Sequence, residues 1–387
     1  MIPPRVVEAL RGLARPVCAY VYDRATLRAT AAGLRAALPP GTLLCYAVKA
    51  NGHPDVVAAL ASTVDGLEVA SGGELALARA AGAGLVMFGG PAKTDDALAA
   101  AIAAGATVNV ESGHELRRLS LLAAAAGATV PVCLRVNRAG APALHGSHRM
   151  TGVPTPFGID ETQLDDAVAL AASLPGIEPV GYHLHAVSNN LDAAAHVAFV
   201  ADAVGWSVAA ARRHGIALRY VNTGGGLGID YTGPARFDLA VLHDGLSKVE
   251  LPDGARLVVE PGRFLAAGAG WYAAEVLDLK RTHGRWFAVL RGGTHHFRLP
   301  AAWGYSHPVA VLPVEHWSYP FQRPEVRDAP VDVAGELCTP RDVLARDVYV
   351  DALRVGDIMV FPRAGAYGWD ISHHEFLRHP YPQMVVI

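Results

Sequence analysis

The sequence has little charge, and it has no long run of charged residues of one sign. Only 18% of its 387 residues are charged, and the formal net charge is −3. Proteins that bind nucleic acid or anionic membranes usually carry a basic stripe or a polybasic patch, which this sequence lacks. We therefore expect neither nucleic acid nor a membrane as a partner, which leaves a small molecule as the default ligand.

Cysteine is also scarce. The four cysteines are widely separated, and they form neither a Cys-x-x-Cys pair nor the Cys/His spacing of a zinc site. The amino terminus lacks a cationic segment followed by an apolar core and a cleavage site. These absences predict a reduced cytoplasmic protein with no metal site, no export signal and no membrane span. The cysteines are Cys18, Cys45, Cys133 and Cys338.

The first two-thirds of the sequence contain a regular alternation. Eight short apolar runs are separated mostly by alanine-rich stretches of helical character. Eight alternations of strand and helix are typical of a closed (β/α)8 barrel, an α/β fold, and 387 residues leave enough chain for a second domain. The runs cover residues 43–48, 67–70, 85–88, 107–110, 132–136, 180–184, 220–222 and 256–259.

Each run ends in a residue that is suited to catalysis or to phosphate binding. In (β/α)8 barrels the active site is built on the carboxyl ends of the strands, which is where these residues stand. The sequence therefore predicts an active site at this end of the barrel. In chain order the residues are Lys49, Ser71, Gly89, Glu111, Asn137, His185, Gly224 and Glu260.

The pattern changes near residue 264. Residues 275–280 and 286–290 have the composition of strands, with a His283-Gly284 turn between them. Other strand-like segments are residues 17–22, 347–349, 357–361 and 384–387. We therefore predict a barrel domain over residues 25–263 and a mostly β domain made of residues 1–24 and 264–387.

Lysine is rare, and one lysine stands out. Only four of the 33 basic residues are lysines, and Lys49 alone ends a predicted barrel strand. An amine beside apolar walls is poorly hydrated, which favours its neutral form, a nucleophile for carbonyl groups. The alternative is that Lys49 is an ordinary lysine at the rim of the barrel.

The residues that accompany Lys49 point to one kind of ligand. Glycines 224–226 follow the seventh strand, where barrels commonly bind phosphate through backbone N–H groups. Glu260 and Arg263 follow the eighth strand, and His185 adds a flat ring. Taken singly, the glycines could form an ordinary tight loop, and His185 could be a core residue. Glu260 could likewise be a structural partner of Arg263, but together these groups favour a phosphorylated pyridine that carries an aldehyde.

With these residues the chain resembles the fold type III pyridoxal-phosphate enzymes related to ornithine and diaminopimelate decarboxylases. Residues 46–51 (Tyr-Ala-Val-Lys-Ala-Asn) look like the cofactor-lysine strand of that family, and residues 69–74 like the segment after its second strand. The resemblance implies pyridoxal 5'-phosphate, held by Lys49, with His185 against its ring and Glu260 at its pyridine nitrogen. The residues implied for its phosphate are Ser188, Gly224, Gly225, Gly226, Arg263 and Tyr367.

The same resemblance implies the reaction and the assembly. A carboxylate favours the protonated pyridine nitrogen, which accepts the electron pair that a departing carboxylate leaves, so Glu260 favours a decarboxylase over a racemase. A barrel that only carries the cofactor would need no second domain. Cys338 and Asp342 match a Cys-x-x-x-Asp element that in this family reaches the active site of the partner subunit. We therefore expect a homodimer with shared active sites and Cys338 as a candidate proton donor.

The expected substrate residues differ from those of the basic-amino-acid decarboxylases. Those relatives hold a distal ammonium with acids in the second domain, whereas this chain has no acid in residues 290–298 and has Thr339 directly after the cysteine. Arginine pairs with carboxylates through parallel hydrogen bonds, so a substrate with several carboxylates is expected. The candidate substrate residues are Arg291, His295, His296, Arg298, Thr339, Arg341 and Asp342.

Three segments resemble the siderophore-pathway branch of the family, whose members decarboxylate citryl-amino acids of the citryl-diaminopropionate or citryl-serine type. These segments are residues 188–192, 293–300 and 371–377. A diaminopimelate decarboxylase and a decarboxylase of ornithine or lysine remain the alternatives. The chain departs from the family at Glu68, where aspartate is usual, and at Pro156, where lysine is common.

Overall fold

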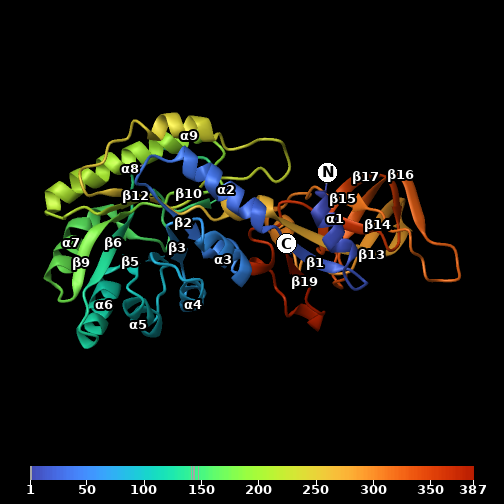
Figure 1. Ribbon diagram of the computed structural model, residues 1–387, viewed down its shortest axis with the longest axis horizontal. Helices are drawn as coiled ribbons and strands as arrows, with labels where there is room; N and C mark the ends of the chain where they lie inside the picture. The colour runs from blue at the N-terminus through green and yellow to red at the C-terminus, as the bar shows by residue number, and fades with distance from the viewer. Residues whose placement is uncertain (1, 141, 143, 147) are drawn as a thin grey trace. The chain divides into compact units, whose positions relative to one another are not determined.

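The computed structural model of the chain describes residues 2–140, 142, 144–146 and 148–387 (Figure 1). By its internal contacts the chain divides into two compact units. The barrel unit consists of Arg28–Asp230 and Ala235–Leu265. The β unit consists of Met1–Leu27, Tyr231–Pro234 and Ala266–Ile387.

The barrel unit contains a closed parallel sheet. Among the described residues, eight strands follow the order β5-β4-β3-β2-β12-β11-β9-β6, and β6 pairs with β5 to close the ring. Each strand overlaps one of the eight apolar runs, so the predicted (β/α)8 barrel is confirmed. The strands are β2 (Leu43–Ala47), β3 (Gly66–Val69), β4 (Val86–Phe88), β5 (Thr107–Val110), β6 (Val130–Asn137), β9 (Ile177–His183), β11 (Tyr220–Asn222) and β12 (Arg256–Val259).

Helices follow the barrel strands in the predicted alternation. Several begin at a side chain that accepts a hydrogen bond from the first turn, as Ser71, Thr94 and Ser112 do. The alternation also includes the short strands β7 (His148–Arg149), β8 (Ile159–Asp160) and β10 (Val187–Ser188). The helices are α2 (Arg24–Ala37), α3 (Pro54–Ala61), α4 (Gly72–Ala80), α5 (Asp95–Ala103), α6 (Gly113–Ala125), α7 (Leu164–Ser173), α8 (Ala193–His214), α9 (Leu239–Leu246) and α10 (Arg263–Ala266).

Of the described helices, α8 alone has the length and hydropathy of a membrane span. Its buried residues include Phe199, Val200, Ala203 and Val204, which recur at helical spacing. The helix lies against β9, β11 and α9. This one-sided burial is typical of a helix that covers a sheet.

The β unit contains one mixed sheet in the order β15-β18-β13-β14-β16-β17, with β1 paired to β13 and β19. This confirms the predicted mostly β second domain. Helix α1 (Pro4–Arg11) packs Val6 and Leu10 into the core with Val17, Trp271 and Val360. The other elements are α11 (Leu299–Trp303), β1 (Cys18–Tyr22), β13 (Gly270–Thr282), β14 (Arg285–Leu290), β15 (Ala310–Leu312), β16 (Glu325–Ala334), β17 (Val343–Arg354), β18 (Ile358–Phe361) and β19 (Gln383–Val386).

Candidate active site

Lys49 lies in a short 3-10 turn, η1 (Val48–Ala50), directly after β2. Its Nζ is 2.7 Å from Oε2 of Glu68, whose carboxylate is buried, and the lysine side chain is 46% exposed. The amine is therefore paired and partly hydrated, which differs from the expected apolar surroundings. Lys49 is paired because Glu68, a buried acid near the end of β3, lies beside it. Glu68 is one of the two positions at which the chain departs from the family pattern.

The glycine run after β11 forms a tight cradle. Gly224 and Gly226 have φ values of +67° and +107°, a region that favours glycine. A Cβ atom on Gly224 would lie 2.4 Å from Nδ1 of His185. The backbone N–H of Gly225 donates to the same Nδ1 atom over 3.2 Å. The His185 ring therefore lies directly against the glycine run.

His185 is held as a neutral ring. Burial lowers the pKa of His185 well below its ordinary value of 6.5, and the positive charges of Arg135 and Lys49 act in the same direction. Because Nδ1 accepts the Gly225 hydrogen bond, the ring proton lies on Nε2. A neutral, flat ring is suited to stacking against an aromatic ligand.

Glu260 is buried immediately after β12. Nδ2 of Asn222 donates to its Oε1 over 2.6 Å, and Nε2 of His183 lies 3.5 Å from its Oε2. Burial alone would raise the pKa of Glu260, but His183, the Asn222 hydrogen bond and the charge of Lys49 bring the pKa below its ordinary value of 4.5. The carboxylate is therefore ionised at neutral pH.

Sequence reasoning missed Asn222 and His183, although each is the last residue of a barrel strand. Their place at the ends of predicted strands could have identified them from the sequence. The other residues implied for the phosphate group lie in both units. Ser188 belongs to β10 and the buried Arg263 begins α10 in the barrel unit, whereas Tyr367 belongs to the β unit and has a φ of +52°.

Two observations show that the barrel residues fit the expected cofactor. The positive φ values of Gly224 and Gly226 give a sharply turned glycine backbone after β11, a kind of segment that is suited to binding phosphate. Glu260 is ionised and buried, which suits a protonated ring nitrogen. The residues that would hold pyridoxal 5'-phosphate are Lys49, His185, Ser188, Gly224, Gly225, Gly226, Glu260 and Arg263.

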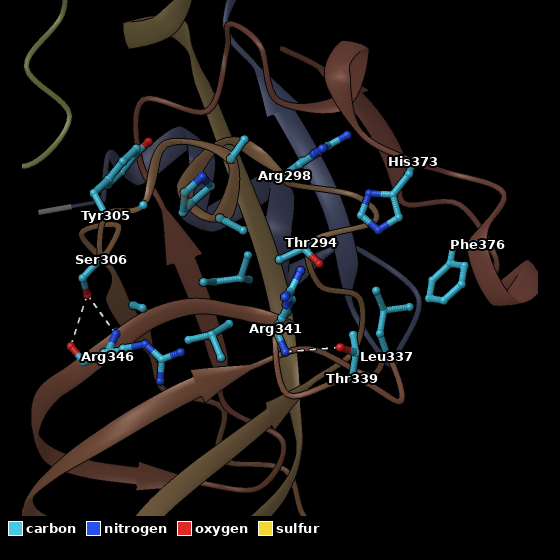
Figure 2. A pocket seen from close by; sticks show the side chains of 17 residues that line it. Thr294, Arg298, Tyr305, Ser306, Leu337, Thr339, Arg341, Arg346, His373 and Phe376 are labelled. Atoms are coloured by element: carbon cyan, nitrogen blue, oxygen red, sulfur yellow. Dashed lines mark hydrogen bonds between the residues drawn. The ribbon is translucent and has the colours of Figure 1, made fainter. Parts of the chain in front are cut away.

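A pocket of about 720 Å³ lies entirely within the β unit. Three of the predicted substrate residues line it, and the lining also includes Arg346, Ser306 and His373. Figure 2 shows Arg298 close to His373, Arg341 beside Thr339, and Arg346 beside Ser306. Among the described residues that line the pocket there is no aspartate or glutamate. The predicted residues that line it are Arg298, Thr339 and Arg341.

The other predicted cations lie elsewhere. Arg291 is ion-paired with Oε1 of Glu336, and ring nitrogens of His295 and His379 lie 3.5 Å from the same oxygen. His295 and His296 are completely buried, and burial together with His295 lowers the pKa of His296 to about 2. Arg291 and His295 thus lie around the partly buried Glu336 instead of lining the pocket, and His296 packs against the His295 ring at a centroid distance of 3.8 Å.

Asp342 connects the segment around Thr294 to the segment around Leu337. Its Oδ1 accepts the backbone N–H of Thr294 over 2.6 Å, and its Oδ2 accepts that of Leu337 over 2.8 Å. The carboxylate is buried, whereas the nearby Cys338 is exposed. Asp342 therefore anchors the loop that presents Cys338. The other three cysteines are buried.

Comparison with known proteins decides the family. A family model described as "Pyridoxal-dependent decarboxylase, pyridoxal binding domain" matches residues 24–267. The chain belongs to the pyridoxal-dependent decarboxylases. It is therefore an enzyme, a carboxy-lyase, and its cofactor is pyridoxal 5'-phosphate, as the sequence predicts.

This decarboxylase has full-length relatives. It is 40% identical over 392 residues to the 2-[(L-alanin-3-ylcarbamoyl)methyl]-2-hydroxybutanedioate decarboxylase of Staphylococcus aureus, over 99% of this chain and 97% of the relative. It is 33% identical over 380 residues to the L-glutamyl-[BtrI acyl-carrier protein] decarboxylase of Niallia circulans, over 94% of this chain and 87% of the relative. The structure of diaminopimelate decarboxylase from Helicobacter pylori complexed with L-lysine is similar with a TM-score of 0.87 and 24% identity, over 98% of this chain and 93% of that one, which shows the shared fold.

Proposed function

We propose that this decarboxylase removes the α-carboxylate of an amino acid that is joined to a citryl-type polycarboxylate, in siderophore biosynthesis. The observation that carries the proposal is the β-unit pocket, which has Arg298, Arg341 and Arg346 and no carboxylate among its described lining residues. Each guanidinium is able to bind a carboxylate through two parallel hydrogen bonds. The name of the S. aureus relative supports the same class, because its substrate combines a hydroxybutanedioate with an alanine.

The barrel residues would do the chemistry common to the family. Pyridoxal 5'-phosphate, when bound, accepts the electron pair that the departing carboxylate leaves on the α-carbon. Lys49 holds the cofactor through Nζ, and Glu68 lies 2.7 Å from that atom, where it is able to accept or return a proton. Glu260 keeps the ring nitrogen protonated because it is ionised and buried. The neutral His185 fixes the plane of the ring.

Cys338 is the proposed proton donor that completes the reaction at the α-carbon. Its thiol is exposed on the loop that Asp342 anchors through two backbone hydrogen bonds. In the family that the chain resembles, this segment reaches the active site of the partner subunit. We therefore propose a homodimer in which each chain completes the other's active site.

The pocket does not favour the diaminopimelate or ornithine alternatives. A substrate with a distal ammonium needs an acid to bind it, and the described pocket residues offer none. Glu336 is the acid nearest to Cys338 in the sequence, but Arg291 neutralises it, and His295 and His379 lie close to the same oxygen. A second carboxylate is therefore a better match for this pocket than an amine.

The test compares substrates and variants side by side. The purified enzyme is offered a citryl-amino acid and ornithine, and carbon dioxide release is followed by mass spectrometry. Arg298→Ala and Arg346→Ala should each lower kcat/KM for the citryl conjugate about ten- to a hundredfold, because each loses a charge-assisted contact. Arg327→Ala is the matched control, because Arg327 is an exposed arginine of the same unit that pairs with Glu325 outside the pocket. A wild-type preference for ornithine, or an unchanged preference in Arg298→Ala, contradicts the proposal.

A further inference from the structure

Asn222 contacts two parts of the proposed cofactor site at once. It is the last residue of β11 and is completely buried. Its Nδ2 donates to Oε1 of Glu260 over 2.6 Å, and its Oδ1 accepts the backbone N–H of Gly224 over 2.9 Å. One end of an amide donates and the other accepts, so these two contacts fix the orientation of the side chain.

The same hydrogen-bond network continues to the ring of His185. The backbone N–H of Glu260 donates to the carbonyl of Gly224 over 2.8 Å, and the N–H of Gly225 donates to Nδ1 of His185 over 3.2 Å. Asn222 therefore lies at the junction of three groups, namely the ring-nitrogen carboxylate, the phosphate cradle and the ring-stacking histidine. A displacement of Asn222 would change the spacing between all three.

Of the described contacts, the hydrogen bond from Asn222 is the shortest one to the Glu260 carboxylate, at 2.6 Å. His183 and Lys49 also favour its ionised form, but Nε2 of His183 lies 3.5 Å from Oε2, which is a longer contact. A buried carboxylate that loses a hydrogen-bond donor is destabilised in its ionised form. The conformation of Glu260 is therefore expected to change when Asn222 is removed.

We infer that Asn222 is a positioning residue that orients the Glu260 carboxylate relative to the glycine cradle, and that it supports cofactor binding through Glu260. The inference rests on the proposed role of Glu260 at the ring nitrogen. A purely structural role for Asn222 makes a different prediction, because its effect would then be independent of Glu260.

The experiment is a double-mutant cycle on cofactor affinity. Full-length protein is dialysed to equilibrium against graded concentrations of pyridoxal 5'-phosphate, and the bound cofactor is measured. Asn222→Ala and Glu260→Gln should each weaken affinity about ten- to a hundredfold, and the double variant should be no more than about twofold weaker than Glu260→Gln. Asn222→Asp keeps the size and the acceptor for Gly224 but replaces the amide donor 2.6 Å from Glu260 with a second acid, so it should weaken affinity at least as much as Asn222→Ala.

Thr223→Val is the matched control. Thr223 is the next residue, it is buried, and its Oγ1 donates to the carbonyl of Val258 over 3.3 Å. The control loses one buried hydrogen bond at the same strand end, and its affinity should stay within about twofold of wild type. Multiplicative losses in the double variant would overturn the inference while leaving the role of Glu260 intact. Unchanged affinity and turnover in Glu260→Gln would overturn both.

Discussion

Replacing Gly224 with alanine tests whether the glycine cradle is required for the fold of the site. At a φ of +67°, alanine costs about 1 kcal/mol relative to glycine. Its Cβ would also lie 2.4 Å from Nδ1 and 2.6 Å from Cβ of His185. Relieving such a clash in a packed region costs about 1 to 3 kcal/mol more. We expect Gly224→Ala to lower the free energy of unfolding by about 2 to 4 kcal/mol and to displace the His185 ring.

Gly215→Ala is the matched control. Gly215 has the same φ of +67° at the end of α8, but no atom lies within 4 Å of the position of a Cβ there. The free energy of unfolding of this variant should fall only by the conformational cost of about 1 kcal/mol, and the variant should still bind the cofactor. The assay is urea unfolding at one fixed cofactor concentration, followed by measurement of bound pyridoxal 5'-phosphate. Equal losses of stability in the two variants would refute the steric argument.

Three more predictions concern the whole enzyme. Borohydride reduction of the holoenzyme should label Lys49, and peptide mapping that finds another labelled lysine would contradict its role. Mixing a Lys49→Ala chain with a Cys338→Ala chain should restore part of the activity if the sites are shared, whereas an active, strictly monomeric enzyme would rule out sharing. Burial lowers the pKa values of His196 and His307 to about 4 and that of His296 to about 2. Because the unfolded chain protonates these histidines below about pH 6.5 and the folded chain does not, each should destabilise the fold by up to about 1.4 kcal/mol per pH unit as pH falls below 6.5. Urea unfolding at pH 7.5, 6 and 5 measures this, and a flat profile would contradict it.

The barrel could be predicted from the sequence because its strands are parallel and buried on both faces. Such strands are continuous apolar runs, which are easy to recognise in a sequence. The rule that catalysis lies at the carboxyl ends of barrel strands then pointed to Lys49, His185 and Glu260. The local sequence indicates where these side chains lie, since each stands within two residues of the end of a barrel strand.

The β unit was harder to predict because its strands are more polar. Strand β16 (Glu325–Ala334) is largely exposed in its first half, is buried mainly near its end, and includes Pro330, and β17 has a positive φ of +51° at Asp347. Proline and charged residues at these positions are typical of loops. Only short parts of β17 therefore stood out as strand-like in the sequence.

The pocket residues show why neighbours in sequence need not share a site. Arg291 and Arg298 are seven residues apart, yet only Arg298 lines the pocket, because the partly buried Glu336 pairs with Arg291. No pattern in the sequence around Arg346 predicts that it lines the pocket. It reaches the pocket because Ser306 Oγ accepts its backbone N–H over 2.8 Å, a contact between residues 40 positions apart.

Asp342 stabilises the fold around the pocket through backbone hydrogen bonds, and not through the side chains that would select the substrate. The carboxylate joins the 294 and 337 segments through backbone N–H groups alone, and these groups are present whatever side chains those positions carry. Positions 294 and 337 are therefore able to change side chain without removing these hydrogen bonds, whereas a Cβ atom on Gly293 would lie 2.6 Å from the Asp342 carboxylate. A change of preference between anionic and cationic substrates therefore requires few substitutions and little loss of stability, which gives a physical route by which one scaffold could diverge to serve several pathways.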